Sequence, residues 1–151
     1  MIREMLLSDI DGIVDVVGRR MFAESAFRDL DYDESKSRLY LSRIICGDRS
    51  FGCVAEVDGE VVGFFTGYVS EYFFGRDLIA TEELWYVVPG HRSSALGLGL
   101  LGAFEDWARG MGVREVCVGL STGNDPARVG GILERRGYRQ MGGVYKLPVV
   151  G

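Results

Sequence analysis

Glu82 and Glu83 are adjacent carboxylates within an otherwise largely apolar stretch, residues 78–88. A carboxylate that is partly removed from water has a raised pKa, and it can then accept a proton from an amine near neutral pH. Side chains alternate along a strand, so the two glutamates are expected to point to opposite faces of a sheet. The same alternation places Glu83 on one face with Trp85 and Val87. We therefore expect Glu83 to be the first candidate for a general base and Glu82 the second.

A glycine-rich segment follows the same strand. The sequence HRSSALGLGLLG, residues 91–102, has the G-x-G-x-x-G spacing of a dinucleotide-binding loop. A loop that enters a helix presents free backbone N–H groups in front of the positive helix end, and it therefore binds pyrophosphate. An arginine adds a cation, and two serine hydroxyls add hydrogen-bond donors. The predicted anion-binding residues are Arg92, Ser93, Ser94, Ala95, Leu96, Gly97 and Leu98.

Two features argue against NAD or FAD as the ligand. In a dinucleotide-binding fold the glycines follow the strand almost directly, whereas residues 89–95 intervene here. That fold also needs an acidic residue about 20 positions later to hold the ribose. The next predicted strand ends in VGLS, residues 118–121, which contains no acid. The loop therefore fits the pyrophosphate of another ligand better.

Hydrophobic periodicity predicts the elements that position these residues. A strand over 2–7 is followed by two helices, of which the second spans about 33–47. Two strands over 51–57 and 61–70, joined by a turn at Asp58-Gly59, precede a third strand over 78–88. The chain then continues with a helix over 95–111, a strand over 113–120, a helix over 125–137, and short strands over 138–141 and 144–147. This order predicts a mixed sheet with helices on both faces, in a single domain over residues 1–151.

Composition excludes several kinds of partner. A net charge of -5 argues against nucleic acid and is compatible with a cationic substrate. Three cysteines and one histidine without metal-ligand spacing predict reduced thiols and no metal. No apolar run approaches the ~18 residues of a membrane span, and the first residues lack a signal-peptide pattern. We expect a cytoplasmic protein with no membrane partner.

The segment VVPGHRSSALG, residues 87–97, resembles the V-x-P-x-x-R/Q-x-x-G-x-G/A segment of the GCN5-related N-acetyltransferase (GNAT) family. The order of elements agrees with that family over the whole chain. The Arg-Ser-Ser form, with YFFG (72–75) before it and AFEDWA (103–108) after it, is similar to acetyltransferases of phages and prophages. The resemblance implies an α/β fold with a mostly antiparallel sheet of about seven strands, splayed between the fourth and fifth strands and flanked by about four helices.

The resemblance also implies a direct transfer of an acetyl group from acetyl-CoA to an amine, without a metal. The backbone of Trp85, Tyr86 and Val87 would pair with the pantetheine of CoA, and the Val87 N–H would donate to the thioester oxygen. Asn124 would contact pantetheine, although it lies about two residues earlier than the usual spacing. The segment ELWYV, residues 83–87, is similar to the Glu-x-x-Tyr-Val strand of some aminoglycoside acetyltransferases, in which such a glutamate binds or deprotonates the amine.

The sequence departs from the family at one catalytic position. Many members have a tyrosine that protonates the leaving thiolate, where this chain has Leu133. The resemblance therefore assigns no general acid to that position. A non-catalytic regulatory module that binds acyl-CoA stays as an alternative. The acceptor amine can belong to a small molecule or to a protein, and the resemblance allows a homodimer.

Overall fold

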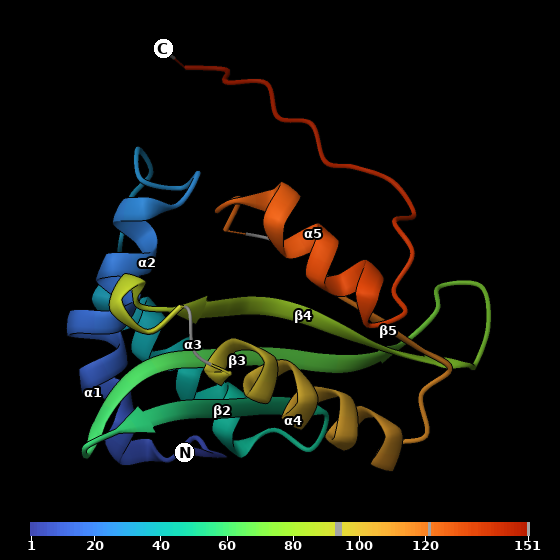
Figure 1. Cartoon of the computed structure of the whole chain (residues 1–151), viewed down its shortest axis with the longest axis horizontal. Coiled ribbons are helices and arrows are strands. Elements are labelled where there is room, and N and C mark those ends of the chain that lie inside the picture. Colours follow the sequence, from blue (N-terminus) through green and yellow to red (C-terminus); the bar gives the residue numbers. More distant parts are fainter. Residues whose placement is uncertain (93–94, 121, 151) are drawn as a thin grey trace.

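A five-stranded sheet forms the centre of the computed structural model, which describes residues 1–92, 95–120 and 122–150 (Figure 1). The strands lie side by side in chain order. Neighbouring strands are antiparallel except for the last two, which are parallel. Their bounds are β1 (Ile2–Glu4), β2 (Ser50–Val57), β3 (Glu60–Glu71), β4 (Leu78–Val87) and β5 (Glu115–Cys117).

The central hairpin follows from local sequence chemistry. Asp58 and Gly59 join β2 to β3 with φ angles of 52° and 81°. Two consecutive residues with positive φ make the tight turn that matches the right-handed twist of paired strands, and aspartate followed by glycine is a favoured pair for it. The predicted hairpin turn is therefore confirmed.

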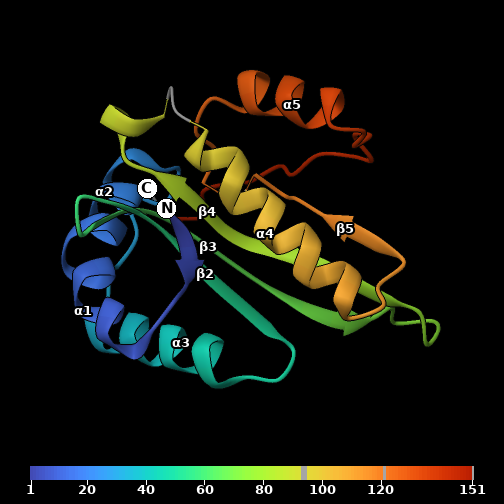
Figure 2. The same ribbon diagram turned by 60° about the horizontal axis from the view of Figure 1, so that its bottom comes forward.

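Four helical regions flank the sheet. The first runs without a break through α1 (Ile10–Gly12), a π-helical turn η2 (Ile13–Val17) and α2 (Gly18–Glu24). The others are α3 (Glu34–Cys46), α4 (Leu96–Gly110) and α5 (Pro126–Arg135), and short 3-10 turns lie at η1 (Leu7–Asp9) and η3 (Pro89–His91). Regions α1 to α3 cover one face of the sheet, and α4 lies across the other (Figure 2).

The predicted starts of two helices, near residues 33 and 125, agree with the structure, and an aspartate caps each of them. The Asp33 carboxylate accepts the Lys36 N–H at 2.9 Å before α3 begins. The Asp125 carboxylate accepts the Arg128 N–H at 3.4 Å before α5 begins. A short carboxylate at this position pairs a backbone donor that the helix itself leaves unpaired.

Aromatic side chains fill the space between α4 and the sheet. Phe65 and Phe104 are fully buried, with ring centres 4.7 Å apart, and Phe104 stacks on Trp107. Gly67 lies directly under this helix, since a Cβ atom at Gly67 would come within 2.6 Å of the Phe104 ring. On the opposite face, Phe64 packs in the core with the first helical region.

The prediction of about seven strands is wrong for the described residues, which form five. The segments 138–141 and 144–147 form no strand, and Tyr145 is 98% exposed. The fifth strand is also shorter than the predicted 113–120, because its pairing with β4 extends only from Glu115 to Cys117. An alternating pattern forms a strand only where a neighbouring edge pairs with it.

No helix within the described parts of the chain combines the length and the apolar character needed to cross a membrane.

Candidate active site

A β-bulge in β4 separates the two glutamates in a way that simple alternation does not predict. Thr66 pairs with Leu84, but the next residue of β3, Gly67, pairs with Glu82. Glu83 is therefore the extra residue of the bulge, and the side-chain alternation shifts by one position. The expectation that Glu83 shares a face with Trp85 and Val87 is wrong. Because of the bulge, Glu82 lies on the same face of the sheet as Trp85 and Val87.

Glu82 lies on the face that α4 covers. Its register partner Gly67 faces Phe104 of that helix, and directly paired residues share a face. Glu82 is only 5% exposed, and its Oε2 accepts the backbone N–H of Gly119 at 3.1 Å. Gly119 is the second residue after the end of β5, so this carboxylate links β4 to the chain beyond β5.

Glu83 points to the opposite face, toward α3. Its Oε2 accepts a hydrogen bond of 2.6 Å from the hydroxyl of Tyr40, which in turn lies 2.8 Å from the Thr66 hydroxyl. Glu83 is half-buried, in contrast to Glu82. Burial, together with the hydrogen bond to Glu83, raises the pKa of Tyr40, so the phenol stays protonated and donates.

The edge of β4 opens next to these glutamates. The parallel pairing with β5 extends only from Ile79 to Thr81. Further along β4, the Val88 N–H donates to Val62 of β3 at 2.8 Å. Since backbone groups alternate between the two edges of a strand, the Val87 N–H points the other way, toward the edge that β5 no longer covers.

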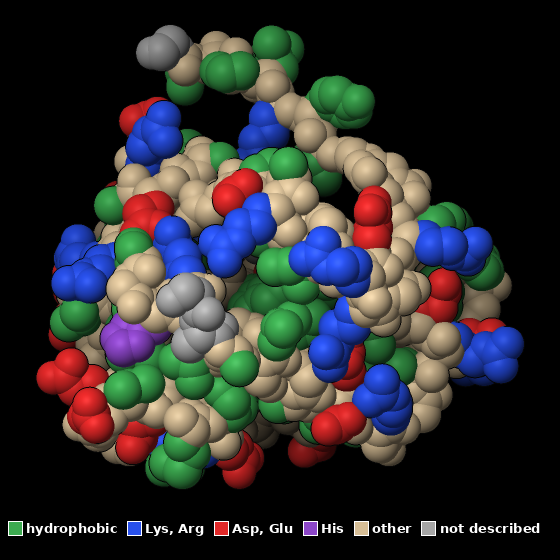
Figure 3. Space-filling view, viewed as in Figure 1, with side chains coloured by type: hydrophobic (Ala, Val, Ile, Leu, Met, Phe, Trp, Pro, Cys, Tyr) green, Lys and Arg blue, Asp and Glu red, His purple; other side chains and the backbone are tan. Residues whose placement is uncertain are grey.

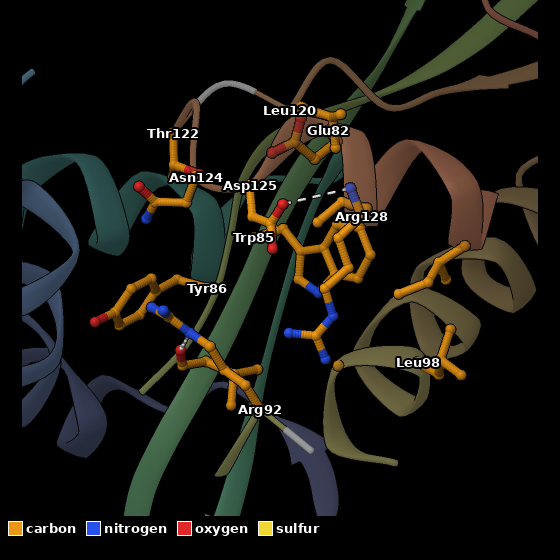
Figure 4. Close-up of a pocket in the computed structure, with 14 residues that line it drawn as sticks. Glu82, Trp85, Tyr86, Arg92, Leu98, Leu120, Thr122, Asn124, Asp125 and Arg128 are labelled. Atoms are coloured by element: carbon orange, nitrogen blue, oxygen red, sulfur yellow. Dashed lines mark hydrogen bonds between the residues drawn. The ribbon is translucent and has the colours of Figure 1, made fainter. Parts of the chain in front are cut away.

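A cavity of about 340 Å³ lies along this open edge (Figure 4). Its walls come from the end of β4, the start of α4, the loop after β5 and the first turns of α5. The space-filling view in Figure 3 shows a hollow lined by hydrophobic side chains, with Lys and Arg side chains around it. The lining residues are Glu82, Trp85, Tyr86, Val87, Arg92, Gly97, Leu98, Leu120, Thr122, Asn124, Asp125, Arg128, Val129 and Ile132.

Arg92, the predicted anion-binding cation, is held by protein groups. Its Nη2 donates to Glu24 at 2.5 Å, and its Nε donates to the Val87 carbonyl at 2.8 Å. The guanidinium stacks 5.2 Å from the centre of the Tyr86 ring, and the Tyr86 hydroxyl donates to the same glutamate. Burial, followed by the hydrogen bond to Glu24, raises the pKa of Tyr86 to about 12. These contacts fix Arg92 at the rim of the cavity.

Arg128 brings a second cation to the cavity, one that the sequence analysis did not identify. It lies in the first turn of α5 and lines the cavity (Figure 4). An anion in this part of the cavity would therefore meet both a cation and the start of α4. A single arginine in an amphipathic helix gives no sequence signal for such a role.

The residues present fit a ligand that carries amides and phosphates. Asn124 lines the cavity, and its Nδ2 is buried without a hydrogen-bond partner within the described chain. A buried donor without a partner costs free energy, and an amide or carbonyl of a bound molecule would pair it. The pantetheine arm of CoA has such groups, and the cations and the helix start suit its phosphates.

The predicted loop residues are only partly described. Gly97 and Leu98 line the cavity, whereas Ala95 and Leu96 cap and begin α4. A Cβ atom at Gly97 would lie 3.9 Å from Trp85, an ordinary van der Waals contact, so this wall of the cavity does not itself require a glycine. Ser93 and Ser94 lie outside the described residues. Leu133, at the position of the family tyrosine, is 7% exposed and packs in the core.

No group of three or more His, Cys, Asp or Glu side chains in the described parts of the chain is arranged to hold a metal ion.

The family model that matches this chain is that of the acetyltransferase (GNAT) family, over residues 19–138. A curated relative, an aminoglycoside N(6')-acetyltransferase type 1 of Klebsiella aerogenes, is 42% identical over 62 residues. This match spans 38% of this chain and 40% of the relative. The narrower likeness to phage enzymes is not supported, because the named relatives are aminoglycoside acetyltransferases.

Solved structures share the fold over nearly the whole chain. An aminoglycoside N-acetyltransferase solved with CoA, AAC(6')-Iy, is 17% identical with a TM-score of 0.76, covering 98% of this chain and 93% of that one. A protein described as a transcriptional regulator from Bacillus halodurans is 18% identical with a TM-score of 0.78, covering 98% of both chains. Because the family model matches residues 19–138, which are most of this chain, the chain belongs to the GNAT acetyltransferases, the enzymes that use acetyl-CoA as acyl donor.

Proposed function

We propose that this protein transfers the acetyl group of acetyl-CoA directly to an amino group of a polycationic small molecule of the aminoglycoside class. The observation that carries the proposal is the open edge of β4, which has the cavity on one side of the sheet and the half-buried Glu83 on the other. Acetyl-CoA and the acceptor amine can then approach the open edge of β4 from opposite faces of the sheet. This arrangement suits direct transfer, in which catalysis depends mainly on positioning.

The cavity side would hold the cofactor. Acetyl-CoA supplies an activated thioester, and the residues of this chain bind and orient it. The start of α4 and the Arg128 guanidinium would bind phosphate oxygens, with Arg92 fixed at the rim. The open backbone edge at Trp85 and Val87 would pair with the pantetheine amides, as an added strand pairs with a sheet edge. Asn124 would supply an amide donor.

The Val87 N–H is proposed as the donor to the thioester oxygen. It points to the open edge because its neighbour Val88 donates in the other direction, to β3. A backbone donor fixed by a strand needs no rearrangement when negative charge develops on the oxygen. Such a donor is typically worth about 3 kcal/mol of transition-state stabilisation.

Glu83 is proposed as the general base. Alkyl ammonium groups have pKa values near ~10 and must lose a proton before the nitrogen can attack. The half-buried carboxylate of Glu83, held by Tyr40, lies on the face opposite to the cavity. Glu82 is a weaker candidate, because it is 5% exposed and accepts the Gly119 N–H.

The proposed substrate class is supported by the negative charge of this chain and by the names of two similar proteins. The chain has a net charge of -5, and exposed carboxylates precede α3 on the Glu83 side, at Asp29, Asp31 and Asp33. A cationic acceptor would be attracted to this region. The curated relative and AAC(6')-Iy are both named as aminoglycoside acetyltransferases.

The test is a panel of amines with acetyl-CoA, followed by the release of free thiol. It includes aminoglycosides with a 6'-amino group, the linear polyamine spermidine, free lysine and a lysine-containing peptide. We expect the highest kcat/KM with aminoglycosides. A preference for the peptide would assign a protein substrate. If CoA binds but no amine releases thiol, the protein is instead a binding module, in line with the buried Leu133.

A further inference from the structure

We infer that Tyr40, on α3, is a positioning residue for the reaction, which holds the Glu83 carboxylate toward the acceptor amine through the Tyr40–Thr66 hydrogen-bond pair. This inference rests on the proposed role of Glu83 as general base. The two side chains come from elements 43 residues apart in the sequence and meet on the face opposite to the cofactor cavity.

The geometry ties the Glu83 carboxylate to the helix layer. The Tyr40 hydroxyl donates to Glu83 Oε2 at 2.6 Å and lies 2.8 Å from the Thr66 hydroxyl. Thr66 is fully buried within β3, so the pair is anchored in the central sheet. A hydroxyl that has both a donor and an acceptor partner has its orientation fixed. The bulged glutamate is thereby held in one rotamer.

The bulge explains why a contact from another layer matters here. A residue at a bulge leaves the regular ladder, so the neighbouring strand does not fix its direction as it does for residues in the ladder. Glu83 is the extra residue between Leu84 and Glu82 in the register of β3 and β4. The hydrogen bond from Tyr40, on the helix layer, helps to fix the direction of this carboxylate.

The protonation states suit this role. Burial and the hydrogen bond to Glu83 raise the pKa of Tyr40, so the phenol stays a donor throughout the working pH range. The Tyr40 phenol donates to the Glu83 carboxylate, and a hydrogen bond of this kind is stronger when the acceptor is charged. Loss of the Tyr40 hydroxyl should therefore weaken the support of the form of Glu83 that accepts a proton, and the activity should respond most on the acidic side of the pH profile.

The experiment compares Tyr40→Phe with wild type in the amine acetylation assay across pH. We expect kcat/KM for the amine to fall roughly 10- to 100-fold at neutral pH, because hydrogen bonds to charged groups are the strong ones. The acidic limb of the pH profile should move to higher pH. The KM for acetyl-CoA should stay close to wild type, since Tyr40 does not line the cavity.

Two further variants separate positioning from simple packing. Tyr32→Phe removes another half-buried phenol, which donates to the Val14 carbonyl instead of to a glutamate, and it should leave the acidic limb in place. Thr66→Val removes the hydroxyl that orients Tyr40, and it should give a smaller shift in the same direction. This variant keeps the inference testable if Tyr40→Phe folds poorly.

A double-mutant cycle separates the inference from the proposed function. In the Glu83→Gln background, Tyr40→Phe should cause little further loss, because the two groups act as one unit. If Glu83→Gln is inactive while Tyr40→Phe has a normal rate and an unmoved acidic limb, the positioning role is wrong and the base assignment stands. If Glu83→Gln is fully active, the base assignment fails and the positioning role fails with it.

Discussion

The Glu82 carboxylate accepts the Gly119 backbone N–H at 3.1 Å, at the place where β4 and β5 separate. Backbone pairing between these strands ends at Thr81 and Cys117. One residue further along β4, a side chain takes over the link to the diverging chain. This hydrogen bond connects the two strands at the place where the cavity begins, so a buried carboxylate here has a structural explanation.

Replacing Glu82 should therefore affect the cofactor side more than the acceptor side. Glu82→Leu leaves the Gly119 N–H without its acceptor, which costs about 1–3 kcal/mol. We expect a lower melting temperature and a higher KM for acetyl-CoA. Glu82→Gln keeps an acceptor oxygen and should be milder. Equal stability and equal cofactor affinity for wild type and the leucine variant would show that this hydrogen bond has no such role.

Replacing Glu83 should affect the chemical step. Glu83→Gln keeps the size of the side chain and removes its charge, so kcat/KM for the amine should fall roughly 10²–10⁴-fold. The loss should shrink at high pH, where more of the amine is already neutral. The affinity for CoA, measured by calorimetry, should change little. A normal rate across the pH range would mean that water or another side chain removes the proton.

Arg128 should contribute to cofactor affinity through its charge. Arg128→Gln should weaken CoA binding about tenfold, a loss that increases at low salt, since a phosphate contact is electrostatic. The matched control is Arg135→Gln, which removes the same charge from the other end of α5, outside the cavity. Comparison with dephospho-CoA then identifies the phosphate: an equal loss assigns the pyrophosphate, and a smaller loss the 3'-phosphate. If both variants bind CoA like wild type, the contact does not exist.

The same binding assay separates CoA from dinucleotides. CoA at 100 times its Kd should stabilise the fold by about 2.7 kcal/mol and raise the melting temperature. NAD should give no rise, because the glycines lie within α4 and not in a turn that follows the strand. A rise with NAD and none with CoA would contradict the assignment of the cavity.

Stability toward acid should depend on Asp9. Its carboxylate accepts two hydrogen bonds from Arg3, at 2.8 and 2.9 Å, and this contact with Arg3 lowers the pKa of Asp9. A carboxyl whose folded pKa is lowered stabilises the fold above its unfolded pKa of ~3.9. That contribution is lost as the pH falls through the folded pKa.

The corresponding variant is Asp9→Asn, compared with wild type by urea unfolding. At neutral pH it should be less stable by about 1–3 kcal/mol, and the difference should shrink below about pH 4. Glu60→Gln, which changes an exposed carboxylate at the start of β3, is the control and should be close to neutral. A deficit for Asp9→Asn that is independent of pH would point to packing instead of charge.

Short-range signals in the sequence were sufficient for much of the fold. The Asp58-Gly59 turn and the helix starts near Asp33 and Asp125 each depend on a few neighbouring residues, and each is found where it was predicted. Some of the residues that line the cavity, from Trp85 to Val87 and at Arg92, Gly97 and Leu98, could also be named in advance, because one strand, one loop and one helix start follow each other in the chain. Their individual roles in binding and catalysis stay predictions.

Strand register, side-chain direction and long-range contacts were decided only by the tertiary structure, because they depend on residues far apart in the sequence. The sequence by itself determined that two glutamates lie in one strand, but the bulge opposite Gly67 decided which face each takes. Tyr40 reaches Glu83 across 43 residues, and Glu24 reaches Arg92 across 68. The segment 138–147 carries a strand pattern, yet it forms no strand. Alternation is a local property, whereas register, pairing and side-chain contacts depend on elements that only folding brings together.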